Sequence, residues 1–221
     1  MILAAGRGQR LRPLTDAIPK PLIEVDDKPL IVHHLERLYA AGFMEIVINV
    51  AWQADKIKAR LGNGSQYGVH IRYSDEPEGA LETGGGILKA LPLLGDDTFL
   101  VVNGDIYTDF PYATLKTALT NDDLAHLVMV PNPRHHPDGD FVLDANGRLH
   151  TEGTPRLTYS GLGVHRPEFF KECAPGRFPM LPWWRKAIHA GQLSGQLYKG
   201  RWNDLGTPES LRALGALSSD L

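Results

Sequence analysis

The chain has 221 residues, of which 43% are hydrophobic, 22% charged and 8% aromatic, as in ordinary globular proteins. Its 23 Lys and Arg against 26 Asp and Glu give a formal net charge of −3, so no global positive field attracts nucleic acid or an anionic membrane. The lone Cys173 excludes an intramolecular disulfide and a multi-thiolate metal site, and it predicts a reducing, cytoplasmic compartment. The sequence has no apolar run approaching the roughly 20 residues that span a bilayer and no recognisable signal peptide.

Short apolar runs alternate with amphipathic segments along the first two thirds of the chain. Helices are predicted over 29–41, with Asp27 as a possible cap, and over 54–61 and 86–94. Strands are predicted over 1–5, 45–50, 69–74 and 98–102, the last of which, TFLVV, is apolar throughout as in a parallel strand buried on both faces. This alternation predicts an α/β, Rossmann-like, doubly wound sheet with helices on both faces.

The later part of the chain changes character. Asn146-Gly147 predicts a hairpin, and the other expected elements are strands over 124–131, 141–143, 148–151 and 157–165 and helices over 181–190 and 208–217. We therefore expect a mixed, mainly parallel sheet with antiparallel additions and a small lid-like insertion around residues 132–160, which we call the lid segment. Neither a linker nor an internal repeat divides the sequence, so a single domain is predicted.

Residues 3–15, LAAGRGQRLRPLT, place two glycines and three arginines directly after the first predicted strand. Glycines at such a turn allow backbone N–H groups to approach an anion, and arginines add bidentate contacts to phosphate oxygens. Lys20, in Pro19-Lys20-Pro21, supplies a point charge on a flexible side chain. The same pattern is equally consistent with a tight turn whose arginines are solvated.

Two common phosphate-binding motifs are excluded at this turn. A dinucleotide-binding fingerprint requires a third glycine where this chain has Leu11, and an acidic residue at the end of the second strand where it has Asn49. A Walker-type loop requires Gly-Lys-Ser/Thr after four spacer residues, and the sequence lacks it. Prolines at 13, 19 and 21 also prevent a regular helix directly after the turn.

Three further segments carry candidate functional residues. Asn103-Gly104-Asp105 ends an apolar strand, where α/β proteins bind ligands and an Asp suits Mg²⁺, although a loop-capping Asp is a common alternative. Residues 202–209, WNDLGTPE, predict a short strand, a turn and a helix capped by Thr207; Asp204 either joins Asp105 on one metal or only stabilises the turn. Residues 79–86, GALETGGG, form either a surface where a flat ring lies against bare backbone or a flexible loop.

Taken in order, these segments resemble the sugar-1-phosphate nucleotidyltransferase family, which shows L-x-A-G-x-G-x-R-L-x-P-L-T, P-K-P, G-D after an apolar strand, and W-x-D-x-G-T-P. LAAGRGQRLRPLT, PKP, NGD and WNDLGTPE match all four between residues 3 and 209. The resemblance implies one nucleotidyltransferase domain of glycosyltransferase-A-like architecture over 1–221, with a nucleotide-binding part at about 1–105 and a sugar-binding and lid part at about 106–221. It also implies that a sugar-1-phosphate oxygen attacks the α-phosphorus of a nucleoside triphosphate and releases pyrophosphate.

The resemblance further implies roles for individual residues. Such a transfer depends on positioning and charge neutralisation, and the implied catalytic residues are Arg10, Lys20 and Asp105. Asp105 and Asp204 would hold Mg²⁺. The residues implied to bind the nucleotide are Leu3, Ala4, Ala5, Gly6, Arg7, Gly8, Arg10, Lys20, Glu76, Leu81 and Gly84. Those implied to bind the sugar are Asn103, Gly139, Asp140 and Glu152.

Within the family, LETGGGI, NGDIYTDF and NPRHHPDGDF resemble the bacterial uridylyltransferases that act on N-acetylmuramate-1-phosphate in peptidoglycan recycling. The expected activity is transfer of UMP from UTP to that sugar phosphate, with Mg²⁺ as cofactor, in a monomer or small homo-oligomer. The lactyl carboxylate of such a sugar favours a cationic or donor-rich partner. Arg134, His135 and His136 in the lid segment are candidates, and a solvated polar loop is the alternative.

Other activities stay open at this stage. Mannose-1-phosphate guanylyltransferase is the first alternative, although the LETGGGI loop differs from the L-G-T-A-G pattern typical of guanylyl-transferring relatives. Glucose-1-phosphate uridylyl- or thymidylyltransferase follows. A non-catalytic nucleotide-sugar sensor is a distant third, because such a protein has no need of Arg10, Lys20, Asp105 and Asp204 together.

Overall fold

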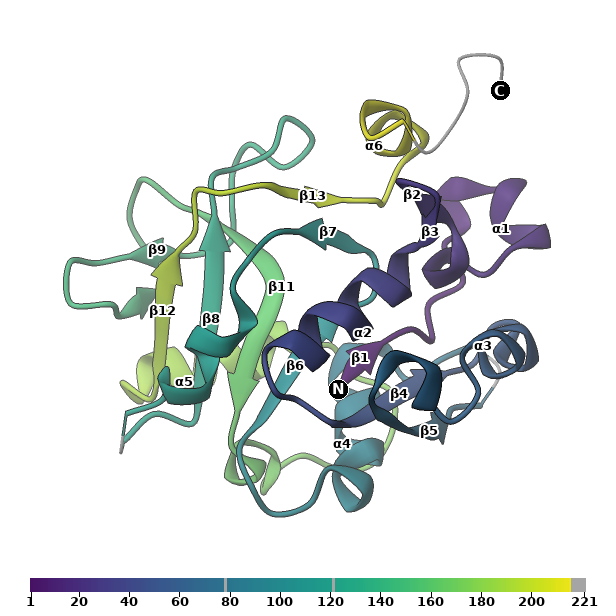
Figure 1. Ribbon diagram of the computed structural model, residues 1–221. Coiled ribbons are helices and arrows are strands. Elements are labelled where there is room, and N and C mark those ends of the chain that lie inside the picture. The colour runs from purple at the N-terminus through teal and green to yellow at the C-terminus, as the bar shows by residue number, and fades with distance from the viewer. Residues whose placement is uncertain (78, 121, 216–221) are drawn as a thin grey trace.

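A mixed β-sheet forms the centre of the computed structural model, which describes residues 1–77, 79–120 and 122–215 (Figure 1). Within these residues the sheet has seven strands in the order β12-β8-β11-β6-β1-β4-β5. Strand β11 runs antiparallel to β6 and β8, and the other adjacent pairs are parallel, so the predicted mixed, mainly parallel sheet is confirmed. The strands are β1 (Ile2–Leu3), β4 (Glu45–Val50), β5 (His70–Asp75), β6 (Phe99–Asn103), β8 (Ala125–Val130), β11 (Thr158–His165) and β12 (Leu193–Leu197).

Helices cover both faces of this sheet, as predicted (Figure 1). Alternating strand residues point to opposite faces, so Ile46, Ile48 and Val50 join one apolar cluster while Val47 joins another. The first cluster includes α2 (Leu30–Ala40) and α3 (Ala54–Leu61), and the second includes α4 (Glu82–Leu94) and α5 (Leu181–His189). The parallel strands are therefore buried on both sides, which explains their continuous apolar runs.

Short elements complete the fold around the sheet. Strand β7 (Ile106–Thr108) pairs antiparallel with β13 (Trp202–Asp204), and β2 (Glu24–Val25) pairs with β3 (Lys28–Pro29). The predicted hairpin is present as β9 (Val142–Leu143) and β10 (Leu149–His150). Helices α1 (Leu14–Ala17) and α6 (Pro208–Ala213) and the 3₁₀ helices Gln9–Leu11, Lys20–Leu22, Ser65–Tyr67, Tyr112–Thr117 and Pro167–Phe170 complete the described elements. No helix among the described residues is long and apolar enough to cross a membrane.

The largest difference from the sequence prediction lies at the start of α4. This helix begins at Glu82 rather than 86, so Gly84 and Gly85 lie inside it together with Gly86. A Cβ at Gly84 would lie 2.3 Å from the Phe178 ring, and one at Gly85 would lie 2.1 Å from the Gly176 carbonyl oxygen. The first two glycines therefore allow another segment to pack directly on the helix backbone, a contact that sequence periodicity does not reveal.

Other element boundaries also differ from prediction. Asp27 does not cap α2, because it lies in the β2–β3 turn with φ of 59° and the helix begins at Leu30. The strand predicted over 1–5 is reduced to two residues, and the Ala4 N–H that follows it donates to the Asn49 side chain rather than to strand backbone. Strands β7 and β12 were not predicted. The helix predicted over 208–217 ends at Ala213, and positions 216 and 217 lie outside the described residues.

Candidate active site

Two adjoining clefts open beside the carboxyl ends of β1, β4, β5 and β6, the edge at which α/β proteins bind ligands. Asn103 and Asp105 line both clefts and therefore mark their junction. The other residues of the first cleft are Leu3, Ala4, Ala5, Gly6, Lys20, Pro21, Asn49, Glu76, Ala80, Glu82, Thr83 and Gly104. Those of the second cleft are Arg10, Ile106, His135, His136, Asp140, Thr158, Tyr159, Ser160, Gly161, Trp202 and Asp204.

The glycine- and arginine-rich turn after β1 is held by contacts at several points. Gly8 adopts a left-handed conformation with φ of 66°, and its carbonyl oxygen accepts a 2.9 Å hydrogen bond from the Thr15 hydroxyl. The Trp52 indole N–H donates to the Thr15 carbonyl oxygen at 2.9 Å, and the Arg7 guanidinium lies 4.1 Å from the Trp52 ring centroid. Because this turn is anchored to the start of α3, its backbone is preorganised beside the first cleft.

The arginines of this turn lie in different places. Arg10 is exposed, lines the second cleft and lies over Gly206, where a Cβ would come within 3.3 Å of its Nη2. Arg7 lies away from both clefts, on a neighbouring surface cleft that it shares with Trp52. Gly8 does not line either cleft in the described residues, and it shapes the turn instead.

Lys20 and Asp105 form an ion pair at the junction of the two clefts. Lys20 Nζ lies 2.6 Å from Asp105 Oδ2, although the two residues are 85 positions apart. The Lys20 side chain is 10% exposed and that of Asp105 is 39% exposed. Desolvation by itself raises the pKa of Asp105, but the charge and hydrogen bond of Lys20 outweigh it and hold that pKa below its usual value. The carboxylate therefore stays ionised at neutral pH.

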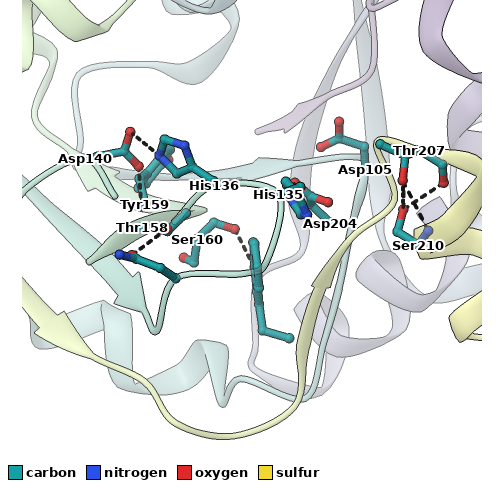
Figure 2. A network of polar contacts seen from close by, with 12 residues as sticks. Asp105, His135, His136, Asp140, Thr158, Tyr159, Ser160, Asp204, Thr207 and Ser210 are labelled. Carbon is teal, nitrogen blue, oxygen red and sulfur yellow. Dashed lines mark hydrogen bonds and ion pairs between the residues drawn. The ribbon is translucent and has the colours of Figure 1, made fainter. Parts of the chain in front are cut away.

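The pairing of β7 with β13 brings Asp204 next to Asp105. Asp204 is the register partner of Ile106, and the Leu205 N–H donates a 2.8 Å hydrogen bond to the Asp105 carbonyl oxygen. Both residues line the second cleft, and Figure 2 shows their side chains on the side of the view away from Asp140. Asp204 Oδ2 is 2.9 Å from His135 Nε2, whereas Asp204 Oδ1 is buried and has no hydrogen-bond partner among the described residues.

These two carboxylates fit a hard divalent cation. An orphaned buried oxygen on Asp204 leaves acceptor capacity for a ligand, and carboxylates completed by substrate phosphates are the usual Mg²⁺ environment. In the described part of the chain no group of three or more His, Cys, Asp or Glu side chains is arranged to hold a metal ion. Any Mg²⁺ bound here would therefore take its remaining ligands from substrate and water.

The lid segment contributes His135, His136 and Asp140 to the second cleft, together with Thr158, Tyr159 and Ser160 at its end. His136 Nε2 lies 3.2 Å from Asp140 Oδ1, and the other Asp140 oxygen accepts a 2.7 Å hydrogen bond from the Tyr159 N–H (Figure 2). Gly139, with φ of 62°, supports this turn but is not one of the described residues that line the clefts. Arg134 and Glu152 are exposed and do not line them either. The structure thus brings His135, His136 and Asp140 to the cleft, and not the other two side chains.

The far end of the first cleft differs from the expected base-binding arrangement. Leu81 and Gly84 are not among its described lining residues, and the Gly84 N–H donates to the Phe178 carbonyl oxygen at 3.0 Å. Glu76 does line it, but each of its carboxylate oxygens accepts a hydrogen bond from the protein: one from Asn49 Nδ2 at 2.6 Å and one from the Leu81 N–H at 2.7 Å. Leu81 is therefore tied to the cleft wall by its backbone.

Sequence reasoning missed several lining residues. Asn49 lines the first cleft, although in the sequence it served only to exclude a dinucleotide-binding fingerprint. Its position near the carboxyl end of a parallel strand could have indicated a place in the site. Ser160 and Gly161 line the second cleft at a β-bulge in β11, where a Cβ on Gly161 would lie 2.9 Å from Asn103 Cβ. The bulge makes room for Asn103, and local sequence did not indicate it.

Comparisons with known proteins agree with this geometry. The sequence profile of the nucleotidyl transferase family matches residues 1–150. The N-acetylmuramate alpha-1-phosphate uridylyltransferase of Neisseria meningitidis serogroup B is 52% identical over 224 residues, which cover 99% of this chain and 97% of that protein. The enzyme of the same name from Caulobacter vibrioides is 35% identical, with 98% and 95% covered.

Solved structures confirm the architecture. A Bacillus anthracis protein, provisionally described as a glucose-1-phosphate thymidylyltransferase and solved with sucrose, superposes with a TM-score of 0.85 at 23% identity. The superposition covers all of this chain and 94% of that one, and at this identity it establishes the fold alone. The full-length sequence relatives, the family profile and this fold together lead to one conclusion: the chain belongs to the nucleotidyl transferase family.

Proposed function

We propose that this protein transfers UMP from UTP to N-acetylmuramate-1-phosphate, yielding UDP-N-acetylmuramate and pyrophosphate, as a cytoplasmic enzyme of peptidoglycan recycling. The observation that carries the proposal is the pair of clefts that meet at Asn103 and Asp105, next to the Lys20 ammonium. Two clefts with a common charged junction suit a transfer between two phosphate-bearing substrates. The names of the two full-length relatives support the particular substrates.

The chemistry follows from what the junction offers. A phosphate oxygen of the sugar-1-phosphate attacks the α-phosphorus, and the bond from that phosphorus to the oxygen bridging it to the β-phosphate breaks. The attacking oxygen is already anionic, so a general base is unnecessary. Lys20, nine-tenths buried, would stabilise the negative charge on the phosphates, and Arg10 in the second cleft would stabilise the departing pyrophosphate. Mg²⁺ held by Asp105 and Asp204 would neutralise phosphate charge when bound.

The substrate assignment is tested by pyrophosphate release with Mg²⁺. UTP, dTTP and GTP would each be paired with the 1-phosphates of N-acetylmuramate, N-acetylglucosamine, glucose and mannose. The proposal expects the highest kcat/KM for UTP with N-acetylmuramate-1-phosphate. A maximum at GTP with mannose-1-phosphate would replace the substrates while keeping the roles of Lys20 and Asp105, and an inactive panel would favour a nucleotide-sugar sensor.

A further inference from the structure

Asn49 and Glu76 form a buried polar pair that links three parts of the first cleft. Asn49 is the penultimate residue of β4 and Glu76 directly follows β5, with exposures of 3% and 9%. Asn49 Oδ1 accepts a 2.8 Å hydrogen bond from the Ala4 N–H, and Asn49 Nδ2 donates to Glu76 Oε1 at 2.6 Å. Glu76 Oε2 then accepts from the Leu81 N–H at 2.7 Å. The continuous path therefore runs from the turn after β1 to the start of α4.

The anchored amide of Leu81 lies between two residues with unfavourable backbone. Ala80 and Glu82, on either side of it, have φ of 56° and 58°, a left-handed conformation that is costly for residues other than glycine. Both line the first cleft. Such a conformation persists only where surrounding contacts impose it. The Glu76 carboxylate supplies such a contact, because it accepts a hydrogen bond from Leu81, the residue between Ala80 and Glu82.

Helix α4 is shaped to accommodate this pair. A Cβ on Gly86 would lie 2.5 Å from Glu76 Oε1 and 2.8 Å from Asn49 Nδ2. The helix backbone thus closes over the pair from the other side, and both side chains are confined to the observed orientation. Of the three glycines in this helix, Gly86 is the one that makes room for polar atoms of the cleft wall.

We propose that Asn49 and Glu76 act together as a positioning pair that sets the geometry of the triphosphate-binding cleft. Glu76 does not bind the base with a free carboxylate, because both of its oxygens already accept hydrogen bonds from the protein. The pair holds the Ala4 backbone on one side of the cleft and the segment 80–82 on the other. This inference rests on the proposed function only in taking a nucleoside triphosphate as the ligand of the first cleft.

Exchanging the amide of residue 49 and the carboxylate of residue 76 tests the proposal. Asn49→Asp alone places two carboxylates against each other, and Glu76→Gln alone leaves one of the two facing N–H donors without an acceptor. In the double variant Asn49→Asp/Glu76→Gln, the Asp accepts from the Ala4 N–H and from the Gln amide, whose oxygen accepts from the Leu81 N–H. All three hydrogen bonds and the net charge are then restored, with the negative charge moved from residue 76 to residue 49.

The measurements are KM for each substrate, using the triphosphate that the unaltered protein consumes fastest, so that a wrong base assignment leaves the test intact. Each single variant should raise KM for the triphosphate roughly tenfold or more, with KM for the sugar-1-phosphate within about twofold, and the double variant should recover to within about threefold. Thermal unfolding midpoints of all variants separate this effect from a loss of folding. A surface exchange at exposed positions, Asn63→Asp/Glu45→Gln, makes the same atomic changes and should leave both KM values unchanged.

Two results would overturn the proposal. One is a folded double variant that binds the triphosphate as weakly as Glu76→Gln, because the position of the charge would then matter rather than the hydrogen bonds. The other concerns Gly86→Ala, whose added Cβ displaces the pair without altering its chemistry. The proposal expects this variant to show the same rise in KM for the triphosphate. A Gly86→Ala variant with a native unfolding midpoint and an unchanged KM would contradict a positioning role, and this arm decides the question if the exchanged pair does not fold.

Discussion

At the scale of single residues, the Lys20–Asp105 pair dominates the candidate active site. We expect Lys20→Met to lower kcat/KM by about two to three orders of magnitude, because the charge that stabilises the phosphates is lost. Steady-state pyrophosphate release measures the change. Lys28→Met is a matched control, since Lys28 also lies 2.6 Å from a carboxylate, that of Glu36, but on the exposed surface. A loss below tenfold for Lys20→Met would contradict the role assigned to this lysine.

Asp204 offers a second residue-level prediction. Its Oδ1 is buried without a partner in the described part of the chain, so it is the oxygen best placed to take a cation. Asp204→Asn preserves shape and removes the charge, and we expect it to raise the Mg²⁺ concentration for half-maximal activity by about tenfold or more. Asp97→Asn, at an exposed loop position, should leave the Mg²⁺ titration unchanged. An unaltered titration in Asp204→Asn would exclude this carboxylate from the metal site.

At the scale of elements, helix α6 is separated from the end of β13 by three residues and has a complete N-terminal cap. The Thr207 hydroxyl accepts from the Ser210 N–H at 3.2 Å, and the Ser210 hydroxyl accepts from the Thr207 N–H at 3.1 Å (Figure 2). Leu211, fully buried, packs this helix against Leu11 and Leu205, beside the arginine-rich turn. The cap predicted from Thr207-Pro208 is therefore present, and it helps to hold the segment that ends in Asp204.

The contribution of this cap to the free energy of unfolding can be measured. Thr207→Ala should lower the free energy of unfolding by about 1 kcal/mol, because the N–H groups of the first turn lose their acceptor. Thr207→Ser keeps the hydroxyl and should retain most of that stability. Urea denaturation of the three proteins gives the comparison, and equal stabilities for the alanine and serine variants would show that the cap contributes nothing.

At the scale of the whole molecule, two buried histidines couple folding to pH. Burial lowers the pKa of His34 to about 4 and that of His165 to about 3, against an ordinary value of 6.5. The folded state therefore keeps both rings neutral where the unfolded chain protonates them. Their effect is absent above pH 6.5, and stability falls below it until the folded pKa values are reached.

The slope of this loss can be predicted. Each histidine costs about 1.4 kcal/mol per pH unit below pH 6.5, so the pair should remove about 4 kcal/mol between pH 6.5 and pH 5. His165→Gln retains an acceptor for the Trp184 indole N–H, which donates to His165 Nε2 at 3.3 Å, and it should reduce the slope in urea unfolding experiments by about 1.4 kcal/mol per pH unit. His70→Gln, at a side chain that is 79% exposed, should not change the slope. An unchanged slope in His165→Gln would contradict a buried neutral histidine.

Elements whose signals are local, and the chemistry of the motifs, could be predicted from the sequence. The strand over 45–50 and the helix over 54–61 match the structure residue for residue, because apolar periodicity and a closing glycine act within one segment. The family resemblance, drawn from four motifs, identified Lys20, Asp105 and Asp204 as candidates before any contact among them was visible. The Thr207 cap was equally predictable, since it depends on neighbouring residues only.

Contacts between residues far apart in the sequence could not be predicted in this way, because they depend on how the whole chain packs. Asp105 and Asp204 come together because β7 pairs with β13, and Lys20 reaches Asp105 across 85 positions. Gly84 and Gly85 lie inside α4, although the helix was expected to begin at 86, and the segment around Phe178 packs on their bare backbone. Both Glu76 carboxylate oxygens accept hydrogen bonds from residues of other segments, Asn49 and Leu81. Local patterns report on neighbours along the chain, whereas close packing between remote segments selects the contacts that form the clefts.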